Sequence, residues 1–144
     1  MTIHRNLSLC HPKAVARFTA LANDLIRAYE AGETKTLFKI FETYRDPFRL
    51  ADLITKRVTK AGPFESAHQY GLAVDYVPFI DVDDAARLSE ITGERHFVGW
   101  NWHSTHDYRF LATRAQHFQL TVPITWDPCH VQHPNFYVPF RDLT

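Results

Sequence analysis

Residues 66–75 read SAHQYGLAVD and set His68 and Asp75 seven positions apart, with Gly71 between them. The segment 72–78 is apolar except at Asp75, which predicts a strand of the core. A carboxylate in a core strand needs a compensating partner, because burying an unpaired charge is costly. A glycine allows a tight turn, so both side chains could reach one ion. The spacing alone leaves a second interpretation open, in which His68 is a loop residue and Asp75 a strand-edge acid.

A second cluster favours the metal interpretation. Residues 126–132 read WDPCHVQ and place Asp127 three positions before His130. His68, Asp75 and His130 together supply two imidazoles and one carboxylate, the ligand number of a catalytic zinc site that keeps one position for water. The carboxylate of Asp127 is ionised at neutral pH and is able to accept a proton from that water. The sequence therefore predicts Zn2+ as the cofactor and metal-assisted hydrolysis as the reaction.

The two clusters together carry a family resemblance. The pattern S-x-H-x-x-G-x-A-x-D, followed downstream by D-x-x-H, resembles the LAS-type zinc peptidases. That family includes D-Ala-D-Ala carboxypeptidases and dipeptidases, and L-alanyl-D-glutamate endopeptidases that phages use as endolysins. The resemblance implies that His68, Asp75 and His130 bind zinc and that Asp127 is the catalytic base.

A third segment extends the resemblance toward the N-terminus. Residues 43–47 read TYRDP and are similar to the family's Y-R-[ST]-P helix start. By that similarity, Arg45 matches the arginine that helps polarise the scissile carbonyl in the dipeptidase branch. A cation beside a developing oxyanion is physically reasonable. An arginine at a helix start is equally often a salt-bridging surface residue, so that alternative stays open for Arg45.

Two features depart from the family pattern or compete with it. Residues 99–103 read GWNWH where endolysin-type members usually carry a W-G-G-D-W-like stretch, so an acidic position is lost. Residues 117–120 read HFQL and resemble the family's H-F-[EQ]-L ending, but Arg114 rather than an acid precedes His117 by three. We therefore favour His130 over His117 as the last ligand. Cys129 is excluded as a ligand, because neighbouring side chains of an extended segment point in opposite directions.

Hydrophobic periodicity predicts an α+β fold for one small domain, residues 1–144, with a mainly antiparallel sheet flanked by helices as in LAS metallopeptidases. Asp81, Asp83 and Asp84 favour a helix start over a calcium site, because negative charge suits the N-terminal end of a helix. The expected helices cover 12–31, 47–58, 83–92 and 104–116, and the expected strands or extended segments cover 35–44, 72–78, 96–99, 117–125 and 127–139.

Composition limits the class of protein. The 144 residues are 45% hydrophobic, and sixteen basic side chains balance sixteen acidic ones. This balance excludes a nucleic-acid coat, whose affinity depends on an excess of Lys and Arg. Two cysteines far apart indicate a reduced compartment rather than a bridged scaffold. We expect no signal peptide, no stable membrane insertion and a monomer.

The functional expectation follows from the resemblance. It implies a zinc peptidase of bacterial peptidoglycan stem peptides, and specifically an L-alanyl-D-glutamate endopeptidase acting as a phage or prophage endolysin. Such an enzyme would be held in the cytoplasm and would reach the cell wall after holin-type release. Two alternatives are a D-Ala-D-Ala carboxypeptidase or dipeptidase and a non-catalytic wall-binding module of the same fold. Asp127 argues against the module, because binding alone needs no base beside the metal.

Overall fold

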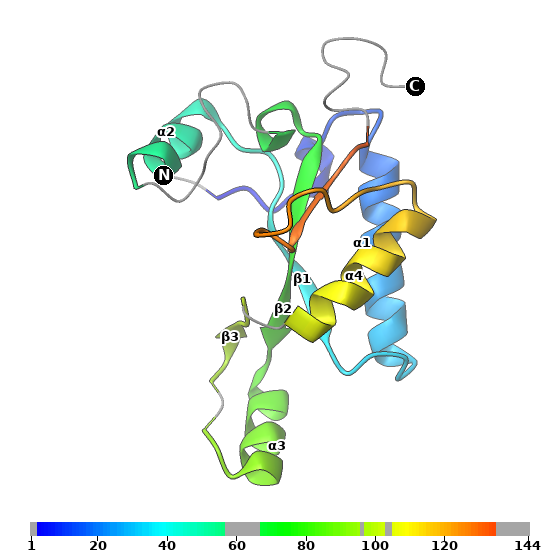
Figure 1. The fold of residues 1–144 in the computed structure, drawn as a ribbon, viewed down its shortest axis with the longest axis vertical. Helices are drawn as coiled ribbons and strands as arrows, with labels where there is room; N and C mark the ends of the chain where they lie inside the picture. The colour runs from blue at the N-terminus through cyan, green and yellow to red at the C-terminus, as the bar shows by residue number, and fades with distance from the viewer. Residues whose placement is uncertain (1–2, 57–66, 96, 103–104, 135–144) are drawn as a thin grey trace.

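A computed structural model describes residues 3–56, 67–95, 97–102 and 105–134 (Figure 1). It confirms the predicted α+β class, with helices around an antiparallel sheet. Val58, Ser66, His96 and the segment 135–139 of the sequence predictions lie outside the described residues. The elements in chain order are η1 Leu7–Leu9, α1 Val15–Glu30, β1 Leu37–Glu42, α2 Pro47–Thr55, η2 Ala67–Tyr70, β2 Ala73–Ile80, α3 Val82–Thr92, β3 Gly99–Trp100, α4 Thr105–His117 and β4 His130–Gln132.

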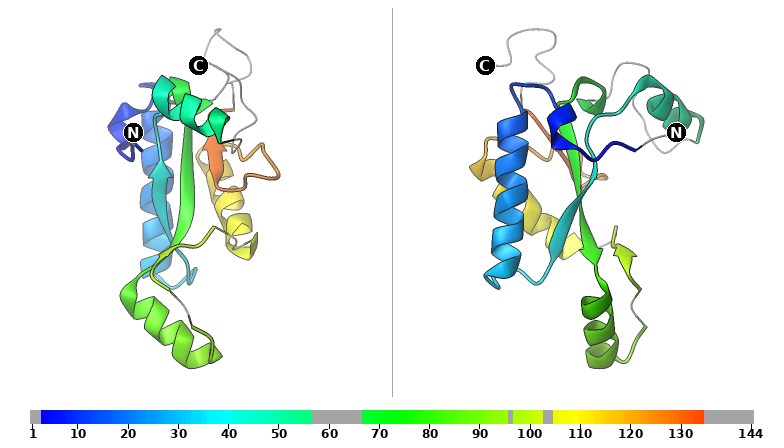
Figure 2. Two further views of the ribbon diagram at one scale, coloured as in Figure 1. Left: turned by 90° about the vertical axis from the view of Figure 1, so that its left-hand side faces the viewer. Right: turned by 180° about the vertical axis from the view of Figure 1, so that it is seen from behind.

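Strand β2 is the centre of the sheet. It pairs with β1 along one edge and with both β3 and β4 along the other, and every pairing is antiparallel (Figure 2). Strand β4 pairs with the beginning of β2, and β3 pairs with its end, where Phe79 lies opposite Trp100. The first six residues of β2 are all buried, so both faces of the strand are covered there, which explains the nearly continuous apolar run that predicted it.

Helix α1 covers one face of β2. Its buried side chains, Phe18, Leu21 and Leu25, follow three- and four-residue spacing, as expected of an amphipathic helix. The Tyr76 hydroxyl donates to the Phe18 carbonyl at 2.7 Å, so this face of β2 points toward α1. Successive strand residues face opposite sides, and Asp75 therefore points away from α1. The helix begins at Val15 rather than at Pro12, because residues 12–14 form a turn on the His11 carbonyl.

The helix starts predicted from aspartates are confirmed. The side chain of Asp46 accepts from the Arg49 amide at the start of α2, where Pro47 is the first helical residue. The side chain of Asp81 likewise accepts from the Asp84 amide at the start of α3. Both are N-caps that satisfy an amide left free in the first turn. The acidic residues at 81–84 thus serve the helix start that the sequence favoured.

The strand predicted over 117–125 is wrong. Helix α4 continues to His117, and the chain then turns through Gln119, whose φ is 57°. Only an isolated bridge between Thr121 and Gln132 joins this segment to the sheet in the described part of the chain. The alternating apolar residues do pack on the core, with Leu120 buried. Pro123 has no amide to donate, so packing occurs there without a strand ladder.

Gly71 makes the turn that the sequence required between His68 and Asp75. Its φ is +69°, in the left-handed region that glycine adopts without strain. Its carbonyl accepts from the His11 amide at 2.8 Å. A Cβ added to Gly71 would lie 2.5 Å from the His11 nitrogen and 2.9 Å from the Cys10 carbonyl carbon. Conformation and close backbone approach together restrict this position to glycine.

We expect Gly71→Ala to destabilise the protein more than Gly32→Ala. Gly32 also has a positive φ, +75°, but no atom lies within 4 Å of its added Cβ. Gly32→Ala, the control, should therefore lower the free energy of unfolding by about 1 kcal/mol for conformation alone. Gly71→Ala should lower it by about 1–3 kcal/mol more, because the added Cβ clashes with the backbone. Urea denaturation of both variants measures the difference. Equal losses of unfolding free energy in the two variants would show that the close backbone approach at Gly71 does not affect stability.

An ion pair joins α4 to α1. Arg114 Nε and Nη2 donate to the two Asp24 oxygens, each at 2.6 Å, and Arg27 donates to Asp24 at 3.1 Å. Asp24 is largely shielded, with 9% of its side chain exposed. The Arg114 hydrogen bond is the main cause that holds the pKa of Asp24 below its usual value of 3.8. The pair therefore stabilises the fold while the carboxylate is ionised.

We expect Asp24→Asn to lower the free energy of unfolding by about 1–3 kcal/mol at pH 7. Because the folded pKa lies below the unfolded one, this stabilisation is complete above the unfolded value and is lost as the pH falls through the folded value. The difference between wild type and variant should shrink below pH 3.8. Urea denaturation between pH 7 and pH 3 measures it. Glu33→Gln, which alters an exposed partner of Arg27, should change stability much less.

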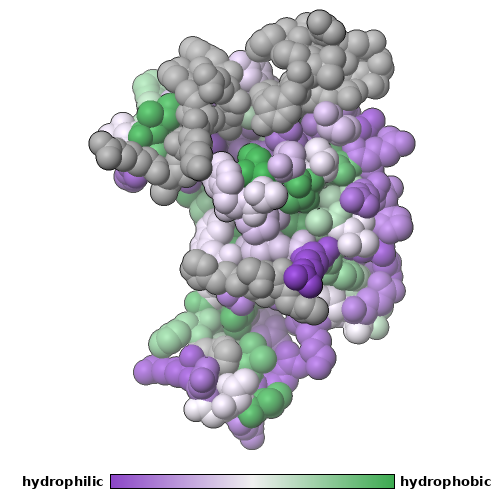
Figure 3. Space-filling model, viewed as in Figure 1, coloured by the Kyte–Doolittle hydropathy of each residue, from purple (hydrophilic) through white to green (hydrophobic). Residues whose placement is uncertain are grey.

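Helix α3 and β3 extend away from the rest of the protein as an arm (Figures 1 and 2). A hydrogen bond of 3.0 Å from the Tyr29 hydroxyl to Asp84 connects α3 to α1. Apolar side chains on the arm are exposed, and Figure 3 shows green surface there among purple. No helix in the described ranges has both the length and the apolar character needed to cross a bilayer.

Candidate metal centre

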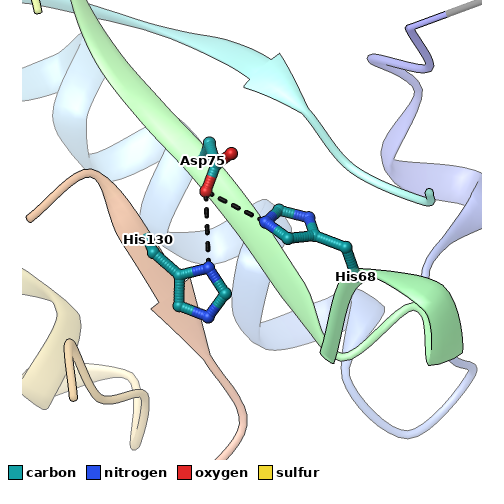
Figure 4. A group of neighbouring side chains, drawn as sticks. All are labelled: His68, Asp75 and His130. Carbon is teal, nitrogen blue, oxygen red and sulfur yellow. Dashed lines mark hydrogen bonds and ion pairs between the residues drawn. The ribbon is translucent and has the colours of Figure 1, made fainter. Parts of the chain in front are cut away.

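Three side chains from separate elements meet on the face of β2 that points away from α1 (Figure 4). His68 comes from η2, Asp75 from β2 and His130 from β4. Asp75 and His130 are direct cross-strand partners, and such partners present their side chains on the same face about 5 Å apart. The turn at Gly71 returns His68 to the same place. All three are buried.

The distances between the donor atoms suit one cation. His68 Nε2 lies 3.0 Å from Asp75 Oδ1, and His130 Nδ1 lies 3.6 Å from the same oxygen. Ligands about 2.0–2.1 Å from a tetrahedral zinc ion stand about 3.3 Å apart. The two measured separations lie on either side of that value. The group is therefore compact enough to hold one ion of this size.

The outer nitrogens of both rings are held by carbonyl oxygens. His68 Nδ1 donates to the Thr43 carbonyl at 2.8 Å, and His130 Nε2 donates to Gln132 Oε1 at 2.8 Å. Neutral rings that donate outward have a lone pair directed inward, which is the arrangement that metal-binding histidines require. The inward lone pairs of the two rings and the Asp75 carboxylate repel one another unless a proton or a metal cation lies between them. The donor set therefore fits a metal ion.

Thr43 and Gln132 were not identified from the sequence. Thr43 contributes a backbone oxygen, which any residue type supplies, so no sequence signal was available. Gln132 is two positions after His130, and its side chain is buried beside the ring. A polar residue in an otherwise apolar strand was the available signal. Such a residue indicates that its buried side chain forms a hydrogen bond, but it does not indicate which residue is the partner.

Charge also favours a cation at this centre. Burial alone would raise the pKa of the Asp75 carboxyl, but His68 and His130 outweigh it and hold that pKa well below its usual range. Burial alone would lower the pKa of His130, but Asp75 outweighs it and raises that pKa. Asp75 is thus an anion that stabilises positive charge between the rings, whether a proton or a metal ion carries it.

Asp127 lies beside the group, with Oδ2 4.0 Å from His130 Nδ1. It stands in the loop before β4, and 37% of its side chain is exposed. Burial, followed by the negative charge of Asp75, raises the pKa of Asp127. A raised pKa makes its carboxylate a stronger proton acceptor. Its place at the edge of the group, half in solvent, allows contact with water and substrate.

Arg45 is held close to the centre. Its amide donates to the His68 carbonyl at 3.0 Å, and its Nη2 donates to Glu42 Oε1 at 2.9 Å. Glu42 is 1% exposed and is the Cα partner of Asp75 across the β1–β2 pair, just after a bulge. Arg49 bonds the other Glu42 oxygen at 2.9 Å. Arg45 therefore forms the salt bridge that the alternative interpretation expected, but it is buried rather than at the surface.

His117 and Cys129, the two residues that we did not favour as metal ligands, lie in different places relative to the candidate centre. His117 is the exposed last residue of α4 and belongs to none of the metal-competent groups in the described ranges. The expected direction of the Cys129 side chain, away from the candidate centre, was wrong. Its thiol lies 3.3 Å from Asp127 Oδ1, and its sulfur is within 4.8 Å of donor atoms of Asp75 and Asp127. Cys129 precedes β4 in a turn, where strand alternation does not apply.

Comparison with known proteins supports the fold. No protein-family model matches the sequence, and no curated protein matches it either. The structure is similar to the crystal structure of the Serratia marcescens L-Ala D-Glu endopeptidase ChiX, with a TM-score of 0.59. The match covers 93% of this chain and 87% of the ChiX chain, at 19% identity. The two chains share one fold.

We expect Gln132→Leu to weaken metal binding about 10–100-fold, because the variant no longer orients the His130 ring. Gln116→Leu is the matched control, since Gln116 is exposed on α4 and should leave affinity unchanged. Competition with a chromophoric chelator measures affinity, and circular dichroism verifies folding. A folded Gln132→Leu protein with wild-type affinity would contradict the assigned contact.

Proposed function

We propose that this chain is a zinc peptidase that hydrolyses a bond of the bacterial peptidoglycan stem peptide. The observation that carries the proposal is the convergence of His68, Asp75 and His130 beside Asp127, in a fold shared with an L-Ala D-Glu endopeptidase. The residues supply each requirement of hydrolysis: a metal site, a proton acceptor and a cation nearby. The sequence motifs of the LAS-type family point to the same four residues.

His68, Asp75 and His130 would hold the zinc ion, which when bound supplies Lewis acidity toward a water molecule and the scissile carbonyl. Asp127 is the proposed general base. Its carboxylate accepts a proton from the attacking water and returns it to the leaving amine. The raised pKa of Asp127 suits both transfers, because the same group must take and release a proton.

Arg45 is proposed to stabilise the carbonyl oxygen of the substrate. Its salt bridge with Glu42 ties the guanidinium to the strand edge opposite Asp75, so its position depends on the sheet. Arg49 shares Glu42, which leaves one net positive charge on the three side chains. A fixed cation is more effective at a developing oxyanion than a mobile one, because it needs no reorganisation.

The specific bond and the biological role belong to the same proposal. We propose the L-alanyl-D-glutamate bond, because ChiX is described as an endopeptidase of that linkage. The endolysin role, cytoplasmic storage and holin-type release rest on the sequence resemblance. Mass spectrometry of muropeptides after digestion identifies the bond. Release of D-alanine alone would instead assign the D-Ala-D-Ala carboxypeptidase activity.

We expect Asp127→Asn to keep one equivalent of zinc and to lose about 100-fold or more of its activity, because a general base contributes about 10²–10⁴-fold. Chelation should abolish muropeptide cleavage in wild type, and added zinc should restore it. Metal analysis and product mass spectra measure the two properties separately. Asp83→Asn, an exposed change on the α3 arm, is the control.

Three results would contradict the proposal. If the purified protein holds no stoichiometric metal, the assignment of His68, Asp75 and His130 as metal ligands is wrong. A fully active Asp127→Asn variant would remove the proposed base. Metal binding without any muropeptide cleavage would favour the non-catalytic wall-binding module.

A further inference from the structure

A second group of potential metal ligands lies directly beside the first. It consists of Asp75, Asp127 and Cys129, whose donor atoms all lie within 4.8 Å of one another. Cys129 is 3% exposed and Asp75 6% exposed, while Asp127 is half-buried. The Cys129 thiol donates to Asp127 Oδ1 at 3.3 Å, so its sulfur lies beside that carboxylate at the border of the buried core.

Asp75 is common to both groups, and its two oxygens allow it to serve both. The same oxygen, Oδ1, faces His68 at 3.0 Å and His130 at 3.6 Å. Figure 4 shows the other Asp75 oxygen turned away from the two rings. A carboxylate has two oxygens and is able to bridge two metal ions, which stand about 3.5–4 Å apart in two-metal sites. If Asp75 bridges in this way, both groups are able to hold an ion at the same time.

The composition of the second group selects the kind of ion. A thiolate is a soft ligand that favours Zn2+ and similar soft cations. Ca2+ and Mg2+ prefer sites made entirely of oxygen ligands. Two carboxylates and one thiolate carry three negative charges, and a divalent cation offsets two of them. The thiol proton passes to solvent when the ion binds.

We propose that Asp75, Asp127 and Cys129 form a second, inhibitory site for a thiophilic divalent cation, filled when the cation exceeds one equivalent. Inhibition rests on the proposed function, because the ion would occupy the carboxylate of the proposed base. An ion on Asp127 prevents that carboxylate from accepting a proton. The site would link hydrolysis to the concentration of free zinc.

Cadmium titration tests the site without any activity measurement. Cd2+ bound to a thiolate has an ultraviolet charge-transfer absorbance, whereas Cd2+ on imidazole and carboxylate lacks it. We expect no such band with the first equivalent and a band with the second. Cys129→Ser should lose the band and keep the first binding step, which also reports that the variant is folded. Cys10→Ser, which changes the other buried cysteine, should retain both steps.

Three outcomes of this titration would overturn the proposal. A band with the first equivalent would make Cys129 a fourth ligand of a single site. A band that persists in Cys129→Ser would assign the thiolate elsewhere. Absence of a band in wild type after two equivalents are bound would exclude thiolate ligation.

Hydrolysis assays test the inhibitory role. Each protein is compared with its own rate at one equivalent of zinc. Excess zinc should reduce the wild-type rate about 100-fold, because general-base catalysis contributes at least that much. The same zinc concentration should reduce the Cys129→Ser rate less than about 3-fold, given the loss of its soft ligand. Equal inhibition of both proteins would overturn the inhibitory role.

The two proposals fail in distinguishable ways. If neither protein cleaves muropeptides at any zinc concentration, the proposed peptidase function fails, and the cadmium titration still decides the second site. If wild type cleaves muropeptides and binds only one equivalent of cadmium, the peptidase stands and the second site is overturned.

Discussion

The ionised carboxylate of Asp75 is the constraint around which this structure is arranged. It lies within the central strand, where an unpaired charge would cost several kcal/mol. Two imidazoles face the same oxygen of Asp75, and their combined effect keeps the carboxylate ionised despite burial. An anion maintained in this way attracts a cation. The buried charge that is unfavourable for folding is therefore the feature that makes this group a candidate metal centre.

Different parts of the fold position the two histidines. His130 is placed by strand pairing, since it stands opposite Asp75 in the β2–β4 register. His68 is placed by a turn that requires glycine at Gly71. Each ring is then oriented by one carbonyl oxygen, from Thr43 or from Gln132. Rigid placement of this kind lowers the reorganisation that a metal ion or a substrate would otherwise demand.

Local sequence signals predicted the helices and the apolar segments well. They predicted less well which segments pair as strands. The capping aspartates, Asp46 and Asp81, mark helix starts because capping depends on neighbours in the chain. The alternation over 117–125 correctly indicated apolar contact with the core, but hydrogen bonding to a neighbouring strand is not a local property. Cys129 shows the same limit, because its orientation depends on where β4 begins.

The sequence by itself determined the amphipathic helices, the central strand, the glycine turn and the four residues of the candidate centre, because each has a signature in spacing or residue type. Only the tertiary structure decided that Asp75 belongs to two adjacent groups of potential metal ligands, that Glu42 tethers Arg45, and that Thr43 and Gln132 orient the rings. These relations join residues far apart in the chain or involve backbone atoms. They depend on strand register and side-chain direction, which no residue encodes alone.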